Sequence, residues 1–317
     1  HSSGVFYSFL GTPLIDSIEA NPTHVYTVNE VLSYVGAPLF APGAGSGYSN
    51  TNYILAGMVA ESATGSHISQ LIRNLILTPL NMDSTFYDIE EAIPGVIAHR
   101  WYNSVDWHDT SRVSLNTSGG PSGSMFSTPS EMAQWYNALM HGQFLSPTSF
   151  AEMTTFTAGN YGLGLLKSTY FGNTCWGHGG NTLGYRTRSI YDPCRKAYVC
   201  GLSNSSPSAV DGITALLYQE VVNRLPGCTG TLSGVADVCR GQNAVTFSVS
   251  PIANATSFVW TLPPGATGTS NTNTITVDFG MSAVSGEISV SGNNAYGVGA
   301  PASLTVNVAV VPTGVTL

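Results

Sequence analysis

The sequence has little charge and no long apolar run. Only 9% of its 317 residues are Asp, Glu, Lys or Arg, well below the roughly 25% that is usual in soluble domains. Ten basic residues face eighteen acidic ones, which gives a net charge of −8 and no basic stripe. No apolar stretch approaches the roughly 18–20 residues that a membrane helix needs. We therefore expect neither a nucleic-acid partner nor a membrane span.

The sequence also shows no initiator methionine and no signal peptide. The chain begins with His1, and no charged segment followed by an apolar segment precedes the first motif. Either a signal peptide was removed or the chain starts inside a longer gene product. The motifs described below favour the second interpretation.

The five cysteines show no C-x-x-C spacing, so we predict neither a metal site nor a cofactor. Cys228 and Cys239 lie close together in the sequence, and we predict that they form a disulfide. Cys175, Cys194 and Cys200 either give one further disulfide and one free thiol, or pack as small buried groups. Disulfides would indicate an oxidising compartment.

The composition changes near residue 226, and the change predicts two domains, at residues 1–226 and 227–317. The hydrophobic content of 43% is enough for real cores. Before the change, helical patterns alternate with Gly-rich turns, which favours an α+β fold. After it, short Val-, Thr- and Ile-rich segments separated by Gly, Pro and Asn predict a β-sandwich. The predicted strands are residues 245–249, 257–262, 273–279, 286–291 and 302–308.

Helices in the first domain are predicted from apolar spacing and from their ends. Gly65 ends the first predicted helix, and Thr128-Pro129 followed by Glu131 starts the third. In the last predicted helix, Ile213, Leu216, Leu217, Glu220 and Val221 recur in helical period. The predicted helices are residues 52–64, 67–77, 130–141 and 209–224, and the predicted strands are residues 162–168, 183–191 and 198–203.

The first candidate site is the segment Gly47-Tyr48-Ser49-Asn50, just before the first predicted helix. A tyrosine that exchanges a proton near neutral pH needs a neighbour, such as a cation, that lowers its pKa. Asn50 could point the same way as Tyr48 and offer both a donor and an acceptor. The alternative is an ordinary turn with a packed tyrosine.

The second candidate site is His178-Gly179-Gly180-Asn181, which precedes a predicted strand. Glycines on an edge strand let a ligand approach the backbone closely. A backbone N–H in such a strand can stabilise a developing oxyanion. His178 would add a polar or cationic group beside the acyl group. The alternative is a Gly bend with a structural histidine.

Six ordered segments together resemble class C β-lactamases, D-alanyl-D-alanine carboxypeptidases and family VIII esterases. "HSSGV" is similar to their H-T-S-G segment, and "PGAGSGYSNTNY" is similar to their P-G-x-x-x-x-Y-S-N-x-x-Y helix entry. "PLNMDSTFY", "GPSGSMFSTPSEM" and "YGLGL" resemble further family segments in the same order. "GHGGNTLGYRTRSIY" places HGG at the family's Lys/His-Thr-Gly position. The resemblance covers residues 1 to about 225.

This resemblance implies an incomplete β-lactamase/transpeptidase-like domain, with helices and an antiparallel sheet, and it implies roles for residues. Tyr48 would be the general base or proton relay, and Asn50 would position the substrate. His178 would be the electrostatic partner, and the backbone N–H of Asn181 would be an oxyanion donor. Gly179, Gly180 and Arg186 would contact the substrate, with Arg186 reading a carboxylate unless it is simply an exposed strand residue.

The family's nucleophile is a Ser in an S-x-x-K motif upstream of the H-T-S-G segment, and this sequence has no such motif. Its two lysines are Lys167 and Lys196, and the residues three positions earlier are Gly164 and Pro193. We therefore expect that the nucleophile lies on a segment upstream of this chain. We also expect the chain as given to show little or no acyl transfer.

The second domain resembles PKD-like, immunoglobulin-like repeats of secreted Bacteroidetes proteins. "VCRGQ", "ATSFVWTLPPGA" and "GNNAYG" carry the resemblance, and Tyr296 stands where many such repeats have Cys. That difference favours the Cys228–Cys239 pairing. Trp260 is expected in the sandwich core. The resemblance implies a spacer or cell-surface anchor and an exported protein, whether secreted, periplasmic or on the cell surface.

The function expected from these resemblances is hydrolysis of a small-molecule or peptidoglycan-like ester or amide through an acyl-enzyme. HGG in place of Lys-Thr-Gly favours an esterase or peptidase over a β-lactamase that destroys antibiotics. The alternative is a non-catalytic penicillin-binding-like or adhesin module. A third interpretation is a carbohydrate-binding surface protein, which depends only on the sandwich and the aromatic content.

Overall fold

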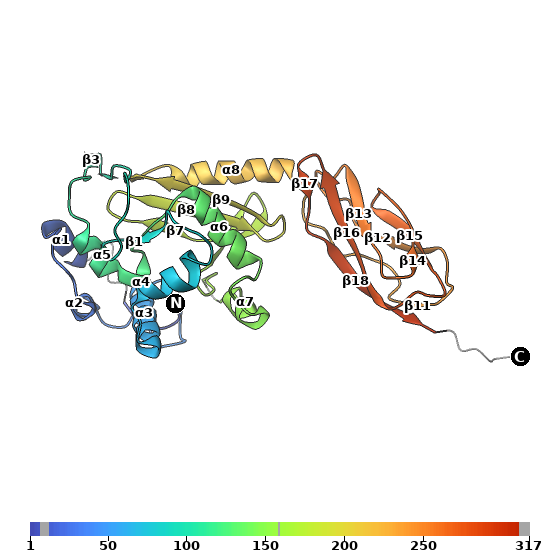
Figure 1. Cartoon of the computed structure of the whole chain (residues 1–317), viewed down its shortest axis with the longest axis horizontal. Coiled ribbons are helices and arrows are strands. Elements are labelled where there is room, and N and C mark those ends of the chain that lie inside the picture. The colour runs from blue at the N-terminus through green and yellow to red at the C-terminus, as the bar shows by residue number, and fades with distance from the viewer. Residues whose placement is uncertain (7–12, 158, 311–317) are drawn as a thin grey trace, which may run out of the picture. The chain divides into compact units, whose positions relative to one another are not determined.

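The computed structural model describes residues 1–6, 13–157 and 159–310 (Figure 1). The chain forms two compact units. Unit 1 is made from His1–Thr169, Cys175–Ile190 and Tyr198–Ala215, and unit 2 from Tyr170–Thr174, Tyr191–Ala197 and Leu216–Leu317. Among the residues described, no helix has both the length and the apolar character needed to cross a bilayer.

Helices and short strands make up most of unit 1. Its helical segments are α1 (Pro13–Ala20), α2 (Val28–Ser33), α3 (Thr51–Thr64), α4 (Ile68–Ile72), η1 (Arg73–Leu77), α5 (Val113–Gly119), η2 (Gly120–Ser122), α6 (Pro129–Met140) and α7 (Pro147–Met153). Helix α8 (Val210–Arg224) belongs to unit 1 up to Ala215 and to unit 2 from Leu216. The short strands are β1 (Phe86–Tyr87), β2 (Trp101–Tyr102), β3 (Val105–Asp106), β4 (Met125–Phe126) and β10 (Ser205–Ser206).

The main sheet before the C-terminal module has the strand order β5-β6-β8-β7, and β9 also pairs with β8. Its strands are β5 (Leu166–Tyr170), β6 (Asn173–Gly177), β7 (Gly179–Asn181), β8 (Arg186–Asp192) and β9 (Ala197–Ser203). Helix α6 packs on this sheet, because the Tyr136 ring stacks on the Tyr198 ring of β9 with centroids 4.2 Å apart. The predicted combination of helices with an antiparallel sheet is confirmed.

Local signals place the helix ends where the sequence predicted them. Gly65 ends α3 with a φ of 70°, a left-handed conformation that favours glycine. Thr128 caps α6 by accepting a hydrogen bond from the backbone N–H of Glu131, and Pro129 is the first helical residue. The helix predicted at 67–77 is α4 followed by one π-helical turn, η1.

Two predicted strands begin later than expected, because glycines introduce turns. The segment predicted as a strand from residue 162 is instead a tight turn, in which Gly164 has a φ of 77°. In this turn Tyr161 bridges to Leu166. The strand predicted from residue 183 starts at Arg186, after a turn in which Gly184 has a φ of 104°.

Helix α8 buries a different face from the one that its apolar period suggested. Ile213, Leu216 and Leu217 are all about half exposed or more. The buried side chains are Val210, Thr214 and Tyr218, four residues apart along one face. Apolar spacing therefore identified the helix but not the face that packs.

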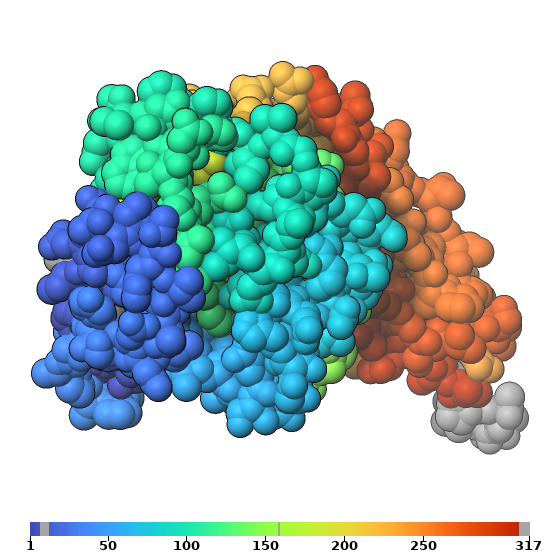
Figure 2. Space-filling view, turned by 60° about the vertical axis from the view of Figure 1, so that its left-hand side comes forward, coloured from blue at the N-terminus to red at the C-terminus, as the bar shows by residue number. Residues whose placement is uncertain are grey.

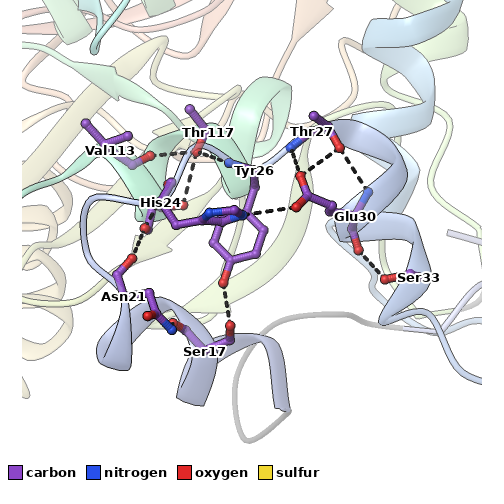
Figure 3. A network of polar contacts seen from close by, with 10 residues as sticks. Ser17, Asn21, His24, Tyr26, Thr27, Glu30, Ser33, Val113 and Thr117 are labelled. Atoms are coloured by element: carbon purple, nitrogen blue, oxygen red, sulfur yellow. Dashed lines mark hydrogen bonds and ion pairs between the residues drawn. The ribbon is translucent and has the colours of Figure 1, made fainter.

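A polar network joins α1, α2 and α5 at the edge of unit 1 (Figure 3). Tyr26 donates from its hydroxyl to Ser17 Oγ over 2.6 Å, and its backbone N–H donates to Thr117 Oγ1 over 3.0 Å. Thr27 and Glu30 form a capping box at the start of α2. Figure 2 shows this N-terminal segment in dark blue at the surface of unit 1. The network adds polar contacts to two short helices whose apolar residues Leu14, Ile18 and Val31 are buried in one hydrophobic cluster.

Unit 2 contains a β-sandwich. One sheet has the order β11-β18-β16-β13 with β17 beside β16, and the other has the order β12-β15-β14. Its strands are β11 (Asp237–Cys239), β12 (Val245–Ser248), β13 (Ser257–Thr261), β14 (Ala266–Thr267), β15 (Thr274–Phe279), β16 (Gly286–Asn294), β17 (Gly297–Val298) and β18 (Ala302–Ala309). In β15, alternate residues Ile275, Val277 and Phe279 are buried. The predicted sandwich is confirmed.

Trp260 lies at the margin of this core. It packs against the buried cluster while remaining partly exposed. Its indole N–H donates to the carbonyl of Thr272 over 2.9 Å. Because the polar end of the indole reaches a partner, the ring can cover the core without leaving a buried donor unsatisfied.

The predicted Cys228–Cys239 disulfide is wrong. Cys228 is bonded to Cys194, whose Cα lies 5.4 Å away, and Cys239 is an exposed free thiol. Cys194 lies in the turn between β8 and β9, and Cys228 follows α8. The folding of α8 brings the two together, so proximity in sequence was the wrong guide. Cys175 is buried, and Cys200 is a partly exposed free thiol.

Candidate active site

The two predicted site segments meet in unit 1. Tyr48, in the loop before α3, and His178, between β6 and β7, have ring centroids 5.7 Å apart. His1 and Tyr161 complete a group of four rings. The centroid of His1 lies 4.4 Å from that of Tyr48 and 4.4 Å from that of Tyr161. Segments far apart in the sequence thus place a phenol and an imidazole side by side.

The first four residues hold the Tyr48 loop in place. The backbone N–H of Ser49 donates to His1 Nδ1 over 3.2 Å, and Asn52 Nδ2 donates to the same atom over 3.0 Å. Ser3 Oγ donates to Asn52 Oδ1 over 2.7 Å. Gly4 has a φ of 75°, and a Cβ there would lie 1.9 Å from the carbonyl oxygen of Phe40. The His-x-Ser-Gly segment therefore holds this loop in place through hydrogen bonds and a close backbone contact.

The His1 imidazole has one orientation consistent with these bonds. Because a backbone N–H donates to Nδ1, that nitrogen is unprotonated, and neutral His1 carries its proton on Nε2. His1 Nε2 is buried and has no hydrogen-bond partner among the residues described. The N–H therefore lies inside the group of aromatic rings, where only weak contacts to their faces are available.

Asn50 and Asn52 have different environments. Asn50 is the N-cap residue of α3, is half-buried, and makes no side-chain capping bond. Its predicted role is to position a substrate, and this stays a prediction. Asn52, which the sequence analysis did not single out, makes the bonds to His1 and Ser3. Asn52, two residues after Asn50, is thus the member of the pair with the structural role.

Strand β7 is an edge strand, as predicted. Its partner is β8, with Gly179 opposite Arg188 and Asn181 opposite Arg186. Ser189 N donates to the His178 carbonyl, and Thr182 N donates to the Tyr185 carbonyl. Backbone groups alternate along an antiparallel strand, so the N–H of Asn181 points away from β8. This is the direction that an oxyanion donor on this edge requires.

The side chains of β8 explain the two glycines of β7. A Cβ on Gly179 would lie 3.4 Å from the Arg188 guanidinium, and a Cβ on Gly180 would lie 2.9 Å from Thr187 Oγ1. The Arg188 contact would be an ordinary one, but a Cβ on Gly179 would also lie 3.1 Å from the Thr187 carbonyl oxygen, so larger residues at either position would crowd Thr187. The glycines therefore serve packing between β7 and β8. The predicted close approach of a substrate to Gly179 and Gly180 stays a prediction.

Arg186 is paired within the protein. Its guanidinium bonds to Asp211 Oδ2, and Arg188 Nε donates to Asp211 Oδ1 over 2.8 Å. Burial raises the pKa of Asp211, but hydrogen bonds from Arg188 and Arg186 outweigh it and the pKa is lowered. This pairing gives Arg186 a structural contact, and its predicted role of reading a substrate carboxylate stays a prediction. Arg188, which lies against Gly179, was not foreseen.

The surroundings of His178 favour the neutral form of its imidazole. Burial lowers its pKa, and the positive charge of Arg188 lowers it further, against a raising effect of its hydrogen bond to the Gly179 carbonyl. Its Nε2 lies 2.7 Å from the hydroxyl of Tyr161. The neutral, polar form of His178 is therefore favoured over the cationic form at neutral pH, and its role as the electrostatic partner of a substrate stays a prediction.

Tyr161 and Tyr53 were missed by sequence reasoning. The hydroxyl of Tyr161 lies 2.7 Å from that of Tyr53, which comes from α3. For the segment around Tyr161, the sequence predicts only a strand of the sheet. Its Tyr-Gly-x-Gly spacing is a turn signal, but nothing local in the sequence identifies the distant partners.

The arrangement can support proton exchange and oxyanion stabilisation on one side of a scissile bond. Within the part of the chain that the structure describes, no group of three or more His, Cys, Asp or Glu residues is suited to a metal ion. The groups gathered next to the free edge of β7 are the Tyr48 phenol, the His178 imidazole in its neutral form and the backbone N–H of Asn181.

Known proteins share this architecture. A D-stereospecific amidohydrolase from Streptomyces sp. is 28% identical, with a TM-score of 0.59, and the match covers 68% of both chains. A D-amino acid amidase from Ochrobactrum anthropi SV3 is 25% identical, with a TM-score of 0.59, over 70% of this chain and 69% of that one.

A relative, the unguisins hydrolase ungD of Aspergillus violaceofuscus, is 23% identical over an alignment 218 residues long, and the match covers 56% of this chain and 37% of the relative. The chain spans little more than a third of the length of the curated relatives that it matches. Residues 225–306 match the model of the PKD-like domain. Residues 1–223 match the beta-lactamase family model, and the chain therefore belongs to the beta-lactamase family of hydrolases.

Proposed function

We propose that this protein is a serine-type hydrolase that cleaves an amide or ester bond through an acyl-enzyme. Tyr48 would exchange the proton of the nucleophile, and the N–H of Asn181 would donate to the oxyanion. The serine would come from a segment upstream of His1. The observation that carries the proposal is the 5.7 Å approach of the Tyr48 and His178 rings beside the free edge of β7.

The substrate class follows from two kinds of support. The two solved relatives at 28% and 25% identity are named for D-stereospecific amide hydrolysis. A neutral His178 offers no cation to a bound group, which favours an uncharged amide or ester over a substrate that needs a lysine-like charge at this position. We therefore propose amides or esters of D-amino acids, or of peptides that contain them, as substrates.

We propose that the protein is exported from the cytoplasm. The Cys194–Cys228 disulfide supports an oxidising compartment, where such bonds persist. The PKD-like module supports the same proposal, since the sequence resembles repeats of secreted proteins. The module would act as a spacer or surface anchor, and peptidoglycan-like material would then be within reach of the enzyme.

The test compares the present chain with a longer protein that includes the encoded upstream segment. D- and L-phenylalanine p-nitroanilide and p-nitrophenyl butyrate serve as substrates. We expect turnover only in the longer protein, and a preference for the D-anilide. Tyr48→Phe in the longer protein should reduce kcat by roughly 10²-fold or more, since positioned proton transfer contributes about 10²–10⁴-fold. Robust turnover by the present chain, or an unchanged kcat in Tyr48→Phe, would refute the proposal.

One alternative is a non-catalytic binding module, which a longer protein that also lacks S-x-x-K would favour. A fluorescent penicillin and a fluorophosphonate probe separate the two functions, because both label an activated serine covalently. Labelling of the longer protein that persists through denaturing electrophoresis supports the hydrolase. Reversible binding without labelling supports the binding module.

A further inference from the structure

Tyr161 connects two residues of the candidate site. It lies at the start of the tight turn before β5 and is only 8% exposed. Its hydroxyl lies 2.7 Å from the hydroxyl of Tyr53 and 2.7 Å from Nε2 of His178. One buried phenol is therefore hydrogen-bonded on both sides.

The carbonyl of Gly179 gives this chain of bonds a direction. His178 Nδ1 lies 2.7 Å from that oxygen, which can only accept, so Nδ1 carries a proton. A neutral imidazole has a single N–H, so Nε2 accepts from the Tyr161 hydroxyl. The Tyr161 oxygen then accepts from the Tyr53 hydroxyl. Protonated His178 would instead donate from Nε2 to the Tyr161 oxygen. The Tyr161 hydroxyl would then have to donate to Tyr53, and the Tyr53 hydroxyl would have to donate elsewhere.

The surroundings favour the neutral arrangement. Burial raises the pKa values of Tyr161 and Tyr53, so both phenols keep their protons. The titratable groups that face His178 are Tyr161 from the turn before β5, Tyr48 from the loop before α3 and Arg188 from β8. None of these is a carboxylate that would stabilise an imidazolium.

We propose that Tyr161 is a positioning residue, which donates to Nε2 and so holds His178 as the neutral tautomer protonated on Nδ1. With Nε2 occupied, His178 presents neither a charge nor an N–H to a bound acyl group at that nitrogen. A proton that enters or leaves at Nε2 passes through the Tyr161 hydroxyl. The meaning of this arrangement for catalysis rests on the proposed function, but the tautomer does not.

The test is nuclear magnetic resonance of the full chain labelled with ¹⁵N-histidine. The spectrum distinguishes the two neutral tautomers by their nitrogen shifts, and a His178→Gln variant assigns the signal among the seven histidines. We expect His178 to be protonated on Nδ1 at pH 7 and to titrate below the usual value of about 6.5. A wild-type spectrum with the proton on Nε2 would overturn the proposal without any variant.

Tyr161→Phe removes the donor to Nε2. Because that hydrogen bond favours the neutral imidazole, we expect its loss to raise the pKa of His178 and increase proton affinity about threefold or more. We also expect the Nε2-protonated tautomer to gain population. An unchanged tautomer and an unchanged midpoint would overturn the proposal.

Two matched variants serve as controls. Tyr53→Phe leaves the Tyr161 donor in place, so the tautomer of His178 should stay as in the wild type. Tyr198→Phe removes another partly buried hydroxyl of unit 1, which bonds to Ser189, and should leave His178 unaffected. The other histidine signals report whether each variant is folded. The correct tautomer in a longer protein without turnover would count against the proposed function alone.

Discussion

Gly57 of α3 lies directly against Pro121 of η2. A Cβ at residue 57 would lie 2.2 Å from Cγ of Pro121, a distance that real Cβ atoms do not adopt. We expect Gly57→Ala to lower the free energy of unfolding by about 1–3 kcal/mol, because overpacking forces backbone or side-chain shifts. Urea unfolding followed by circular dichroism measures the change.

The matched control is Gly212→Ala in α8, where a Cβ meets nothing within 4 Å. Alanine is favoured over glycine within a helix, and Gly212 lies in the first turn of α8, so this variant should gain at most about 1 kcal/mol. Equal effects of the two substitutions would contradict the packing of α3 on η2.

The Cys194–Cys228 disulfide should stabilise unit 2. It closes a loop with a sequence separation of 34 residues, for which loop-closure entropy predicts a stabilisation of about 4 kcal/mol. Cys228→Ser, or a reducing agent, should lower the urea midpoint by a corresponding amount. Cys239→Ser removes an exposed free thiol and should have little effect. Peptide mapping that linked Cys228 to Cys239 would contradict the structure.

Because of Asp211, the free energy of unfolding should fall as the pH is lowered. Its folded-state pKa is depressed, so its contribution is complete above the unfolded value of about 3.9 and is lost as pH falls through the folded value. Asp211→Asn should therefore lower stability at pH 7, and the difference from wild type should shrink towards pH 3. Urea titrations between these pH values measure it. Glu220→Gln breaks an exposed pair with Arg224 and should show a much smaller effect.

Thr128 should contribute to stability through its cap. Thr128→Ala removes the acceptor for the N–H of Glu131 and should cost about 1 kcal/mol. Thr128→Ser keeps the oxygen and should recover most of the loss. Thermal unfolding of the three proteins checks the order, and a Ser variant no better than Ala would rule out the cap as the cause.

Sequence reasoning succeeded where the determining contacts are local. The Thr128 cap and the Gly65 end of α3 depend on neighbours within a few residues, and both were predicted. The meeting of Tyr48 and His178 came from the family resemblance. Their distance could not be derived from spacing, because it depends on how α3 and β7 are arranged.

The features that were missed depend on distant partners. Tyr161 contacts Tyr53, and Cys194 contacts Cys228, through folding of everything between them. The apolar spacing of α8 also indicated the wrong buried face, because Thr214 is buried while Leu216 is 62% exposed. Hydrophobicity alone does not say which face a neighbouring element covers.

Unit 2 contains the short pieces Tyr170–Thr174 and Tyr191–Ala197 together with the C-terminal module, although both pieces lie within the beta-lactamase match. Exchanging modules by recombination at the sequence boundary near residue 224 would separate Cys194 from the cysteine to which it is bonded. A chimera that keeps this hydrolase but replaces its neighbour would need either a new cysteine at the junction or a substitution at residue 194. Shuffling of such modules is therefore constrained by a cross-link that family boundaries do not reveal.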